Sequence, residues 1–526
     1  MTGAIIQLIA HGRDNVYLTH DPQITFFKVI YRRHTNFTKE QIPQSFIKQP
    51  NFGKKGSSII SKRADLLGGI QIVTTLPKIQ TTSDEKAKFA WVKRVGFALI
   101  KSVEIEIGGK IIDRHYGEWL NIWSELTGKI NGNHKSGMKK LIGDVPELTE
   151  FTSSKNEYTL YIPLQFWFCK NSGNALPLIS LQYSDVKINV EFEDASKCYM
   201  LSPTHYIKCR DDIVNFTPFE YIEQNIDGTI AAGIFIEYDI NFKRLYYYKL
   251  TSTKLASVPV ASDFNTSASN SVAITALLAS SQGLKYSIIG KTSGYSTFAE
   301  FNNTTTTHSV AKIRNLSMTQ CYLLVDYYYL DEEERYKFSQ SKHDYLIDQL
   351  YYTPDIEIEN ANFSSPIIAE HPCKLIAWIT QLKYIKSSND HYNYTDSYRN
   401  KILSSESSTA NIGDPVSKSL ISTQTILMNG NPRVSLRDAS YFDKIQMHMH
   451  TSCNISTGIN MYSYAEHPFI HQPSGSCNMS QIDNVKIQLN LSPIVSVNNK
   501  ALFRAYSVCT NILRISSGLA GTVFLK

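Results

Sequence analysis

Apolar and polar residues alternate along much of the chain, which is the period of a β-strand that buries one face. The alternation, or a short β-branched and aromatic run, is clearest over Leu160–Phe168, Val186–Phe192, Gly233–Phe242 and Val485–Leu491. Turn-forming residues flank each of these stretches at both ends. Many short strands with little helical periodicity predict an all-β sandwich or barrel.

Helical periodicity is sparse. The clearest helix is predicted over Asp331–Leu350, because Asp331 is a good N-cap and Glu334 follows three positions later, with further acid in the first turn. Pro354 supplies a stop shortly afterwards. Since strand-rich regions flank this segment, it is interpreted as an inter-domain linker. A weaker helix is predicted over His115–Ser124, directly after a strand.

Two segments far apart in the chain resemble each other. Ser102–Trp119 and Gln424–Phe442 both run from a strand through a tight turn to a second strand that ends in basic and aromatic residues. The turns contain Gly108-Gly109 and Asn429-Gly430, dipeptides that supply the positive φ of a tight hairpin. This similarity is consistent with a duplicated domain.

The composition favours several cores and large buried interfaces. A chain of 526 residues exceeds what one hydrophobic core usually serves, so two or more domains are expected. Only 19% of residues are charged, whereas the chain has 31 Tyr and 24 Phe, an aromatic surplus typical of subunit interfaces. The stretch 251–309 is rich in Ser, Thr, Asn and Ala and is interpreted as a surface insertion.

The charge is mild overall but locally basic. A net charge of +6 and a pI near 8.6 do not indicate a dedicated nucleic-acid binder. Between Lys28 and Arg63, however, nine basic residues accompany a single acid, Glu40. This segment is either a solvated arm or a contact with phosphate, lipid or an acidic neighbour.

The cysteines and termini indicate a protein made in the cytoplasm. Eight cysteines are scattered without a C-x-x-C pair and are interpreted as buried thiols in a reducing compartment. The N-terminus has no basic region ahead of its apolar residues, so no signal peptide is expected. The longest uncharged stretch, Phe264–Leu284, is too polar to cross a bilayer.

No catalytic constellation stands out. The chain has no G-x-S-x-G and no H-E-x-x-H, and Gly290-Lys-Thr292 lacks the first glycine of a phosphate loop. His448 and His450 would share one face of a strand, with His467 or His471 completing a metal set, but surface or interface histidines explain them better. No catalytic residue, cofactor or metal is therefore expected.

Five ordered segments carry a family resemblance. They are Ile6–Phe37, Ile107–Leu120, Leu160–Lys187, Val325–Gln349 and the region around Gln472–Gly475. In these segments the chain resembles the major capsid proteins of nucleocytoplasmic large DNA viruses. The resemblance implies an all-β fold of two tandem eight-stranded antiparallel jelly rolls with short helices and long loop insertions.

The resemblance also implies a division of the chain. We expect an N-terminal arm over 1–35, a first jelly roll over 36–331 with the insertion at about 251–309, a helical linker over 332–350 and a second jelly roll over 351–526. The family's structural motif would be formed by Gln472, Pro473, Ser474, Gly475, Asn478 and Asp483. A basic arm on the inner face of the shell would present Lys28, Arg32, Arg33 and Lys39.

The implied function is that of a major capsid protein whose homotrimers form pseudo-hexagonal capsomers that tile an icosahedral shell. Its partners would be neighbouring capsomers, minor capsid and penton proteins and the internal viral membrane, without specific nucleic-acid binding. It would be made and assembled in the virus factory of the host cytoplasm and would reside in the virion capsid. The alternatives are a minor capsid paralogue and, from a different class, a jelly-roll glycan-binding protein or metal-dependent glycan-active enzyme.

Overall fold

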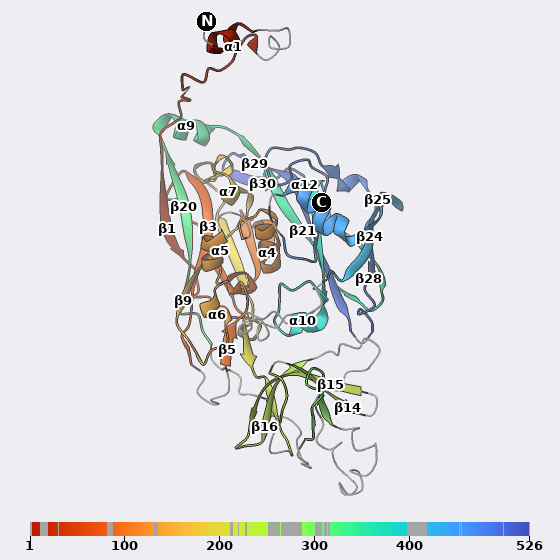
Figure 1. Ribbon diagram of the computed structural model, residues 1–526. Coiled ribbons are helices and arrows are strands. Elements are labelled where there is room, and N and C mark those ends of the chain that lie inside the picture. Colours follow the sequence, from red (N-terminus) through yellow and green to blue (C-terminus); the bar gives the residue numbers. More distant parts are fainter. Residues whose placement is uncertain are drawn as a thin grey trace.

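The fold is seen in a computed structural model of the chain (Figure 1). The residues that the structure describes are 3–10, 19–29, 31–80, 88–130, 135–210, 214–218, 220–226, 229–250, 264, 287–299, 308–309, 313, 316–396, 418–451, 453, 455–497 and 499–524. Most of the predicted insertion at 251–309, including its run of four threonines at 304–307, lies outside them.

The first half forms a β-sandwich of two antiparallel sheets. One sheet has the order β1-β20-β3, with β9 and the short β10 also pairing with β3, and the other has the order β2-β11-β6-β7. The eight main strands are β1 (Phe37–Ser45), β2 (Lys55–Ile59), β3 (Leu66–Leu76), β6 (Ile100–Ile107), β7 (Lys110–Tyr116), β9 (Tyr158–Pro163), β11 (Val186–Phe192) and β20 (Gln320–Leu330).

The second half repeats this arrangement. One sheet has the order β21-β29-β23-β26 and the other β22-β28-β24-β25. Its eight main strands are β21 (His343–Ile358), β22 (Asn362–Pro366), β23 (Pro372–Leu382), β24 (Ile421–Met428), β25 (Asn431–Asp438), β26 (Ile459–Ser463), β28 (Val485–Leu491) and β29 (Ala501–Ser516).

Both sandwiches therefore have the strand order of a jelly roll. Counted along each half, strands 1-8-3-6 form one sheet and strands 2-7-4-5 form the other. The two similar sequence segments are the hairpins between strands 4 and 5 of each half, and the predicted positive φ is confirmed at Gly108-Gly109 and at Asn429-Gly430. The predicted double jelly roll is confirmed.

The predicted linker helix is only partly correct. The helix α9 (Glu332–Gln340) begins after Asp331, whose carboxylate accepts the backbone N–H of Glu334 at 2.9 Å. It ends at Gln340, and residues 343–350 already belong to β21. The predicted range 332–350 was too long because β21 pairs over its whole length with β29, a tertiary contact that overrides local helical preference.

Two predicted strands also extended too far at their C-terminal ends. The alternation over Leu160–Phe168 spans the end of β9 at Pro163 and the helix α7 (Trp167–Lys170), since a proline closes the strand. The strand predicted over Gly233–Phe242 is β15, which starts earlier, at Thr229, and ends at Asp239. Val186–Phe192 and Val485–Leu491 coincide with β11 and β28.

A third sheet lies between β11 and β20 in the chain and at one end of the molecule in space (Figure 1). Its order is β18-β17-β14-β15-β16-β13-β19. Its strands are β13 (His205–Lys208), β14 (Tyr221–Ile226), β15 (Thr229–Asp239), β16 (Arg244–Leu250), β17 (Ile288–Gly290), β18 (Ser296–Thr297) and β19 (His308–Ser309). The sheet thus begins well before position 251, where the composition changes.

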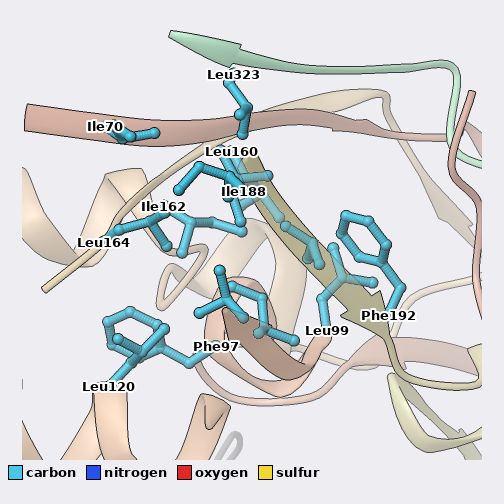
Figure 2. Packing of buried hydrophobic residues seen from close by; sticks show 14 of the residues in the cluster. Ile70, Phe97, Leu99, Leu120, Leu160, Ile162, Leu164, Ile188, Phe192 and Leu323 are labelled. Carbon is cyan, nitrogen blue, oxygen red and sulfur yellow. The ribbon is translucent and has the colours of Figure 1, made fainter. Parts of the chain in front are cut away.

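Each sandwich has its own apolar core. In the first, Ile70 and Leu323 of one sheet, Ile188 of the other, Leu160 of β9, and Phe97 of the helix α3 (Val95–Ala98) fill the space between the layers (Figure 2). The burial pattern of β11 alternates strictly between buried and half-buried, as a strand facing one core requires. The second core forms in the same way around Trp378 and Phe503.

The remaining elements are short, and three of the strands, β10, β27 and β30, extend sheets of the two sandwiches. Other helices are α1 (Gly3–Ile9), α4 (Gly117–Leu126), α5 (Lys135–Leu141), α6 (Pro146–Thr149), α10 (Lys383–Ser387), the π-helix η6 (Tyr441–Ile445) and α12 (Gln446–His450). Other strands are β4 (Ile79–Gln80), β5 (Lys88–Trp91), β8 (Ser154–Lys155), β10 (Leu176–Pro177), β12 (Tyr199–Ser202), β27 (Cys477–Asn478) and β30 (Leu519–Thr522). Among the described residues, none of the helices is long and apolar enough to cross a bilayer.

The sandwiches stand side by side with α4 between them (Figure 1). The helices α1 and α9 lie at one end of the molecule, and the third sheet lies at the opposite end. The length of the sandwiches thus separates α1 and α9 from the third sheet.

Candidate functional site

The surface that joins the two sandwiches, called the seam below, is built around α4. The side chains of Trp119, Ile122 and Trp123 are at most 3% exposed. They form one apolar cluster with residues of the second sandwich, among them Ile379 on β23 and Tyr506 on β29. The Trp119 and Tyr506 rings are stacked, with their centres 5.3 Å apart and their planes inclined by 30°. The seam is therefore a third hydrophobic core, shared by both halves.

The strand β23 is buried on both faces because of this helix. Ile376 and Trp378 point into the core of the second sandwich, whereas Leu375, Ala377 and Ile379 pack against α4. The unbroken apolar run from Leu375 to Ile379 is the sequence pattern of such a strand. A strand that is covered on both faces carries apolar residues at every position, because neither face meets water. This run was not among the predicted strands.

A buried ion network crosses the seam next to the tryptophans. The guanidinium of Arg504, on β29, pairs with Glu118 of α4 and with Asp355 of β21 and also donates to Gln381. The hydroxyl of Tyr506 donates to the other oxygen of Glu118 at 2.7 Å. Only 3% of the Arg504 side chain is exposed. The Glu118 carboxylate, which belongs to the first half of the chain, is thus paired with the Arg504 guanidinium of the second half.

The charges of this network are mutually stabilised. Burial alone would lower the pKa of Arg504, but attraction to Glu118 and Asp355 raises it above the ordinary value. Burial likewise would raise the pKa of Asp355, yet Arg504 and Lys386 lower it overall. Burial raises the pKa of the Tyr506 hydroxyl far above its usual value, so it remains a donor to Glu118. Each ion is stable only because its partner is present.

A second polar bridge crosses the seam at the far end of α4. Arg94 pairs with Glu125 and, at 3.4 Å, with Asp144, all within the first sandwich. The second carboxylate oxygen of Glu125 accepts the backbone N–H of Ser456, in the other half, at 2.8 Å. Polar contacts therefore fix α4 at both its ends.

A cavity of about 460 Å³ opens along the seam near α7. Trp123, Lys170, Asp348 and His471 are among its lining residues. The Lys170 ammonium lies 3.4 Å from Asp348 and 4.1 Å from the centre of the Trp123 ring. Asp348 is also paired with Lys374 at 2.5 Å, and together these cations hold its pKa below the ordinary value although burial opposes them. The two charged groups that line this cavity, Lys170 and Asp348, are thus paired with each other across the seam.

The predicted motif at Gln472–Gly475 forms a turn that directly follows the lining residue His471. Ser474 shapes the turn, because its hydroxyl accepts the backbone N–H of His467 at 2.8 Å and its carbonyl accepts that of Glu466 at 3.0 Å. Gly475 has a φ of 122°, and a Cβ there would lie 3.0 Å from the Tyr464 carbonyl oxygen. Glycine is therefore needed at this position.

The other residues predicted for the motif lie close by in the chain. Asn478 is in β27, and its side-chain oxygen accepts the backbone N–H of Ser480 at 3.1 Å, which caps a short 3₁₀ turn. Gln472, Pro473 and Asp483 are exposed. The motif is thus a loop at the end of the second sandwich whose surface residues remain available to a neighbour.

The histidine pair does not lie on a strand as predicted. His448 and His450 are on the helix α12, not on a strand, so the expectation of a shared strand face was wrong. The Nδ1 atom of His450 lies 3.0 Å from the carbonyl oxygen of Glu466. Within the ranges that the structure describes, no three His, Cys, Asp or Glu side chains are grouped to hold a metal ion.

The N-terminal segment stands away from the sandwiches and is exposed throughout its described residues (Figure 1). Phe26 is 92% exposed, Phe27 97% and Tyr31 85%. The predicted basic residues Lys28, Arg32 and Arg33 are interleaved with them and are also exposed. Exposed aromatic residues thus lie next to exposed cations along this segment.

The fourth predicted basic residue has a different place. Lys39 lies on β1, within the first sandwich, and not in the free arm. Its ammonium pairs with Asp326 on the neighbouring strand β20 at 2.8 Å. The pKa of Lys39 is raised by this hydrogen bond despite some burial. Lys39 therefore stabilises the sheet.

At the opposite end, a buried carboxylate organises the third sheet. Glu220 is 4% exposed and accepts the backbone N–H groups of Thr217, Thr292 and Ser293 at 2.7 to 3.0 Å, together with the Ser293 hydroxyl at 2.7 Å. A Cβ on Gly290 would come within 2.6 Å of this carboxylate. The Glu220 carboxylate thus holds the turn after β17 in place through its hydrogen bonds to Thr292 and Ser293.

We expect Glu220→Ala to release this turn. Because two or more charge-assisted hydrogen bonds are lost, local stability should fall by about 3 kcal/mol, which corresponds to roughly 100-fold faster amide exchange in residues 288–294. Hydrogen-exchange mass spectrometry measures this directly. Glu223→Ala is the control, since Glu223 pairs at 2.5 Å with the half-exposed Lys291 and the loss of this pair should change exchange less than about fivefold. Equal effects of the two substitutions would contradict the role given to Glu220.

Comparison with known proteins gives matches along the whole chain. The family model described as "Major capsid protein N-terminus" matches residues 25–238, and the model described as "Large eukaryotic DNA virus major capsid protein" matches residues 334–521. The "Probable capsid protein 4" of Acanthamoeba polyphaga mimivirus is 38% identical over 534 residues, covering 100% of this chain and 99% of that protein. The "Major capsid protein" of Phaeocystis pouchetii virus is 30% identical over 618 residues, covering 100% of both.

Solved structures share the fold at lower identity. The PBCV-1 virus capsid, a quasi-atomic model, aligns with a TM-score of 0.62 at 22% identity and covers 95% of this chain and 100% of its own. The Faustovirus major capsid protein aligns with a TM-score of 0.63 at 12% identity, covering 96% of this chain and 94% of its own. These alignments extend over both sandwiches and so agree with the double jelly roll.

Proposed function

The chain belongs to the family of large eukaryotic DNA virus major capsid proteins, and on that premise we propose that three copies assemble into a six-sided capsomer. Its role is structural, as the names of its relatives state for them. The observation that carries the trimer proposal is the seam. It already joins two sandwiches of the same strand order side by side within one chain.

The seam also indicates how copies would meet. The contact within the chain uses the edge strand β7 and the following helix α4 of the first sandwich. The corresponding elements of the second sandwich are the edge strand β25 and the following helices η6 and α12. Part of their apolar surface is uncovered, since Leu436 is 59%, Ile445 49% and Met449 64% exposed. Phe442 and Met447 of the same helices are buried within the chain. This surface is called the free edge below.

The first sandwich has a surface on which the free edge of another copy could pack. Within the chain, α4 packs on the outer face of the sheet that contains β21, β29 and β23. The corresponding sheet of the first sandwich contains β1, β20 and β3, and β1 is exposed along most of its length. If the free edge of one copy packs on the outer face of the β1-β20-β3 sheet of the next copy, the same contact can repeat around a ring. Three copies then close it with six sandwiches.

The experiment is to place charge on the free edge. Purified wild-type protein should sediment as a trimer, three times the chain mass of 59.6 kDa. Leu436→Glu with Met449→Glu should give folded monomer, because desolvating two carboxylates in an apolar interface costs several kcal/mol for each contact. Sedimentation velocity measures the mass, and circular dichroism checks the fold.

A matched control uses the third sheet. Ile240 is 59% and Phe242 62% exposed, at the end of the molecule away from the free edge. Ile240→Glu with Phe242→Glu should leave the trimer intact. A trimer that survives charge on the free edge but not on Ile240 and Phe242 would refute the proposed contact. A wild-type monomer would refute the capsomer itself.

The N-terminal arm would lie on the inner side of the shell and contact the anionic surface of the internal membrane. The support is its chemistry, since Phe26, Phe27 and Tyr31 are apolar or amphipathic anchors and Lys28, Arg32 and Arg33 supply positive charge. The third sheet, at the opposite end, would then face outward. Minor capsid and penton proteins would meet the capsomers at their edges.

We expect the arm to bind vesicles that contain anionic lipid. Each basic residue near such a surface contributes about 1 kcal/mol, so Lys28→Gln with Arg32→Gln and Arg33→Gln should weaken binding roughly 100-fold. Flotation with vesicles of phosphatidylcholine and phosphatidylserine measures this. The same charge change at the exposed Lys48, Lys54 and Lys110 on the sandwich serves as the control and should change binding much less. If neither set of three substitutions changed the fraction of protein bound to the vesicles, the proposed role of the arm would be contradicted.

The remaining parts of the proposal follow from the family. The protein would be made in the host cytoplasm and assembled there in the virus factory, and it would reside in the virion capsid. A glycan-active enzyme is not favoured, because the histidines offered for its metal do not converge among the residues that the structure describes.

A further inference from the structure

Three cysteines that are distant in the sequence lie in one row across three neighbouring strands. Cys373 of β23 is paired in register with Cys509 of β29 on one side and with Cys477 of β27 on the other. Directly opposed residues of antiparallel strands project from the same face of the sheet. The three thiols are therefore neighbours, although no cysteine spacing in the sequence reveals it.

The row runs from the core to the surface. Cys373 and Cys509 are fully buried, whereas Cys477 is partly exposed and packs against the same core. The thiol of Cys373 donates to the Leu375 carbonyl oxygen at 3.3 Å and also interacts with Cys509. Small molecules in solution thus reach the row at Cys477.

Two polar groups lie beside the outer pair. The hydroxyl of Tyr464 is buried, has no hydrogen-bond partner among the described residues and interacts electrostatically with Cys373 and Cys477. Burial raises the pKa of Cys477, while the positive charge of Arg433 opposes that rise. A thiolate formed at Cys477 would therefore meet a hydroxyl donor and a cation.

We propose that Cys373 and Cys477 form a disulfide when the folded protein meets a medium that contains a low-molecular-weight disulfide. Opposed Cβ atoms lie about 4.5 to 5.5 Å apart in antiparallel strands, and a disulfide needs about 3.5 to 4.5 Å. β27 has only two residues and can close this gap. Cys509 cannot move as easily, because it lies within the 16-residue β29, which is paired on both sides.

The reaction is thiol–disulfide exchange in two steps. The Cys477 thiolate attacks one sulfur of the small disulfide, forming a mixed disulfide and releasing one small thiolate. The Cys373 thiolate then attacks the Cys477 sulfur, forming the protein disulfide and releasing the second small thiolate. Two protein thiols are oxidised, one small disulfide is reduced to two thiols, and the two protons pass from the protein thiols to the leaving thiolates.

The bond would tie the motif loop to the sandwich. Residues 464–477, which include Gln472–Gly475, would become anchored to β23 at their far end. The bond closes a loop of roughly 100 residues, so the oxidised protein should melt about 5 °C higher than the reduced one. The capsid loop would thus be strengthened when the protein passes from a reducing to an oxidising medium.

The test is oxidation of the folded wild-type protein with oxidised glutathione, followed by alkylation of free thiols and peptide mapping without reduction. One disulfide joining Cys373 to Cys477 is expected, with Cys509 alkylated after denaturation, together with the rise in melting temperature. Cys198→Ser is the control, because Cys198 is buried outside the row, and it should leave the bond unchanged. Cys477→Ser should abolish both the bond and the thermal shift.

Two results would overturn the proposal. One is that all three thiols remain free in the folded protein after prolonged oxidation, although they oxidise in urea. The other is a bond map in which Cys373 pairs with Cys509 or in which Cys477 pairs with a cysteine outside the row. Because the mapping uses wild-type protein, the outcome does not depend on any variant folding.

Discussion

Trp119→Ala is expected to lower the free energy of unfolding by about 4 kcal/mol, the usual cost of deleting a fully buried large aromatic side chain. Trp119 is 2% exposed and stacks on Tyr506, and the Trp123 ring lies 5.5 Å away. Its removal opens a cavity in the shared core of the seam. The two sandwiches would then be held less firmly, and the trimer would dissociate at lower temperature.

Urea denaturation followed by circular dichroism measures this loss, and sedimentation measures the trimer. Trp119→Phe should cost less than half as much, because a ring remains against Tyr506. Tyr336→Ala on α9 is the control, since Tyr336 is 68% exposed and its loss should change stability by less than about 0.5 kcal/mol. Equal stability of Trp119→Ala and the control would show that α4 does not join the sandwiches.

Arg504→Met is expected to have a similar effect for a different reason. Methionine keeps much of the apolar volume but leaves the buried carboxylate of Glu118 without its cation. Removing one partner of a buried ion pair costs about 3 to 5 kcal/mol. Asp355 contributes less to this cost, because 36% of its side chain is exposed and Lys386 remains 2.5 Å away.

The companion variant is Arg504→Met with Glu118→Gln. The glutamine can still accept the Tyr506 hydroxyl, but it carries no charge that needs compensation. The double variant should therefore be more stable than Arg504→Met alone by about 2 kcal/mol. Urea denaturation of the two single variants and the double variant gives the coupling energy. Additive losses would mean that Arg504 and Glu118 do not act as a pair.

The sandwich strands could be predicted where one face alone is buried. β11 and β28 alternate strictly, and their bounds were found from the sequence. Hairpin turns were also predictable, because Gly108-Gly109 and Asn429-Gly430 require positive φ for a local steric reason. The order of the strands within the sheets was not read from these patterns and came from the family resemblance.

Features that depend on distant contacts were missed. The length of α9 was overestimated because the pairing of β21 with β29 lies outside any local pattern. The start of the third sheet was not recognised, since β13 to β16 have the same aromatic and β-branched composition as the sandwiches. The ion network of Arg504 and the cysteine row join positions far apart in the chain, so no spacing in the sequence could indicate them.

Two jelly rolls fixed side by side should allow three chains to form a six-sided tile. Negative-stain microscopy of the purified protein should then give class averages of a single ring with six similar lobes and a near-hexagonal outline. Isolated two-lobed particles, or rings with another number of lobes, would rule out such a tile.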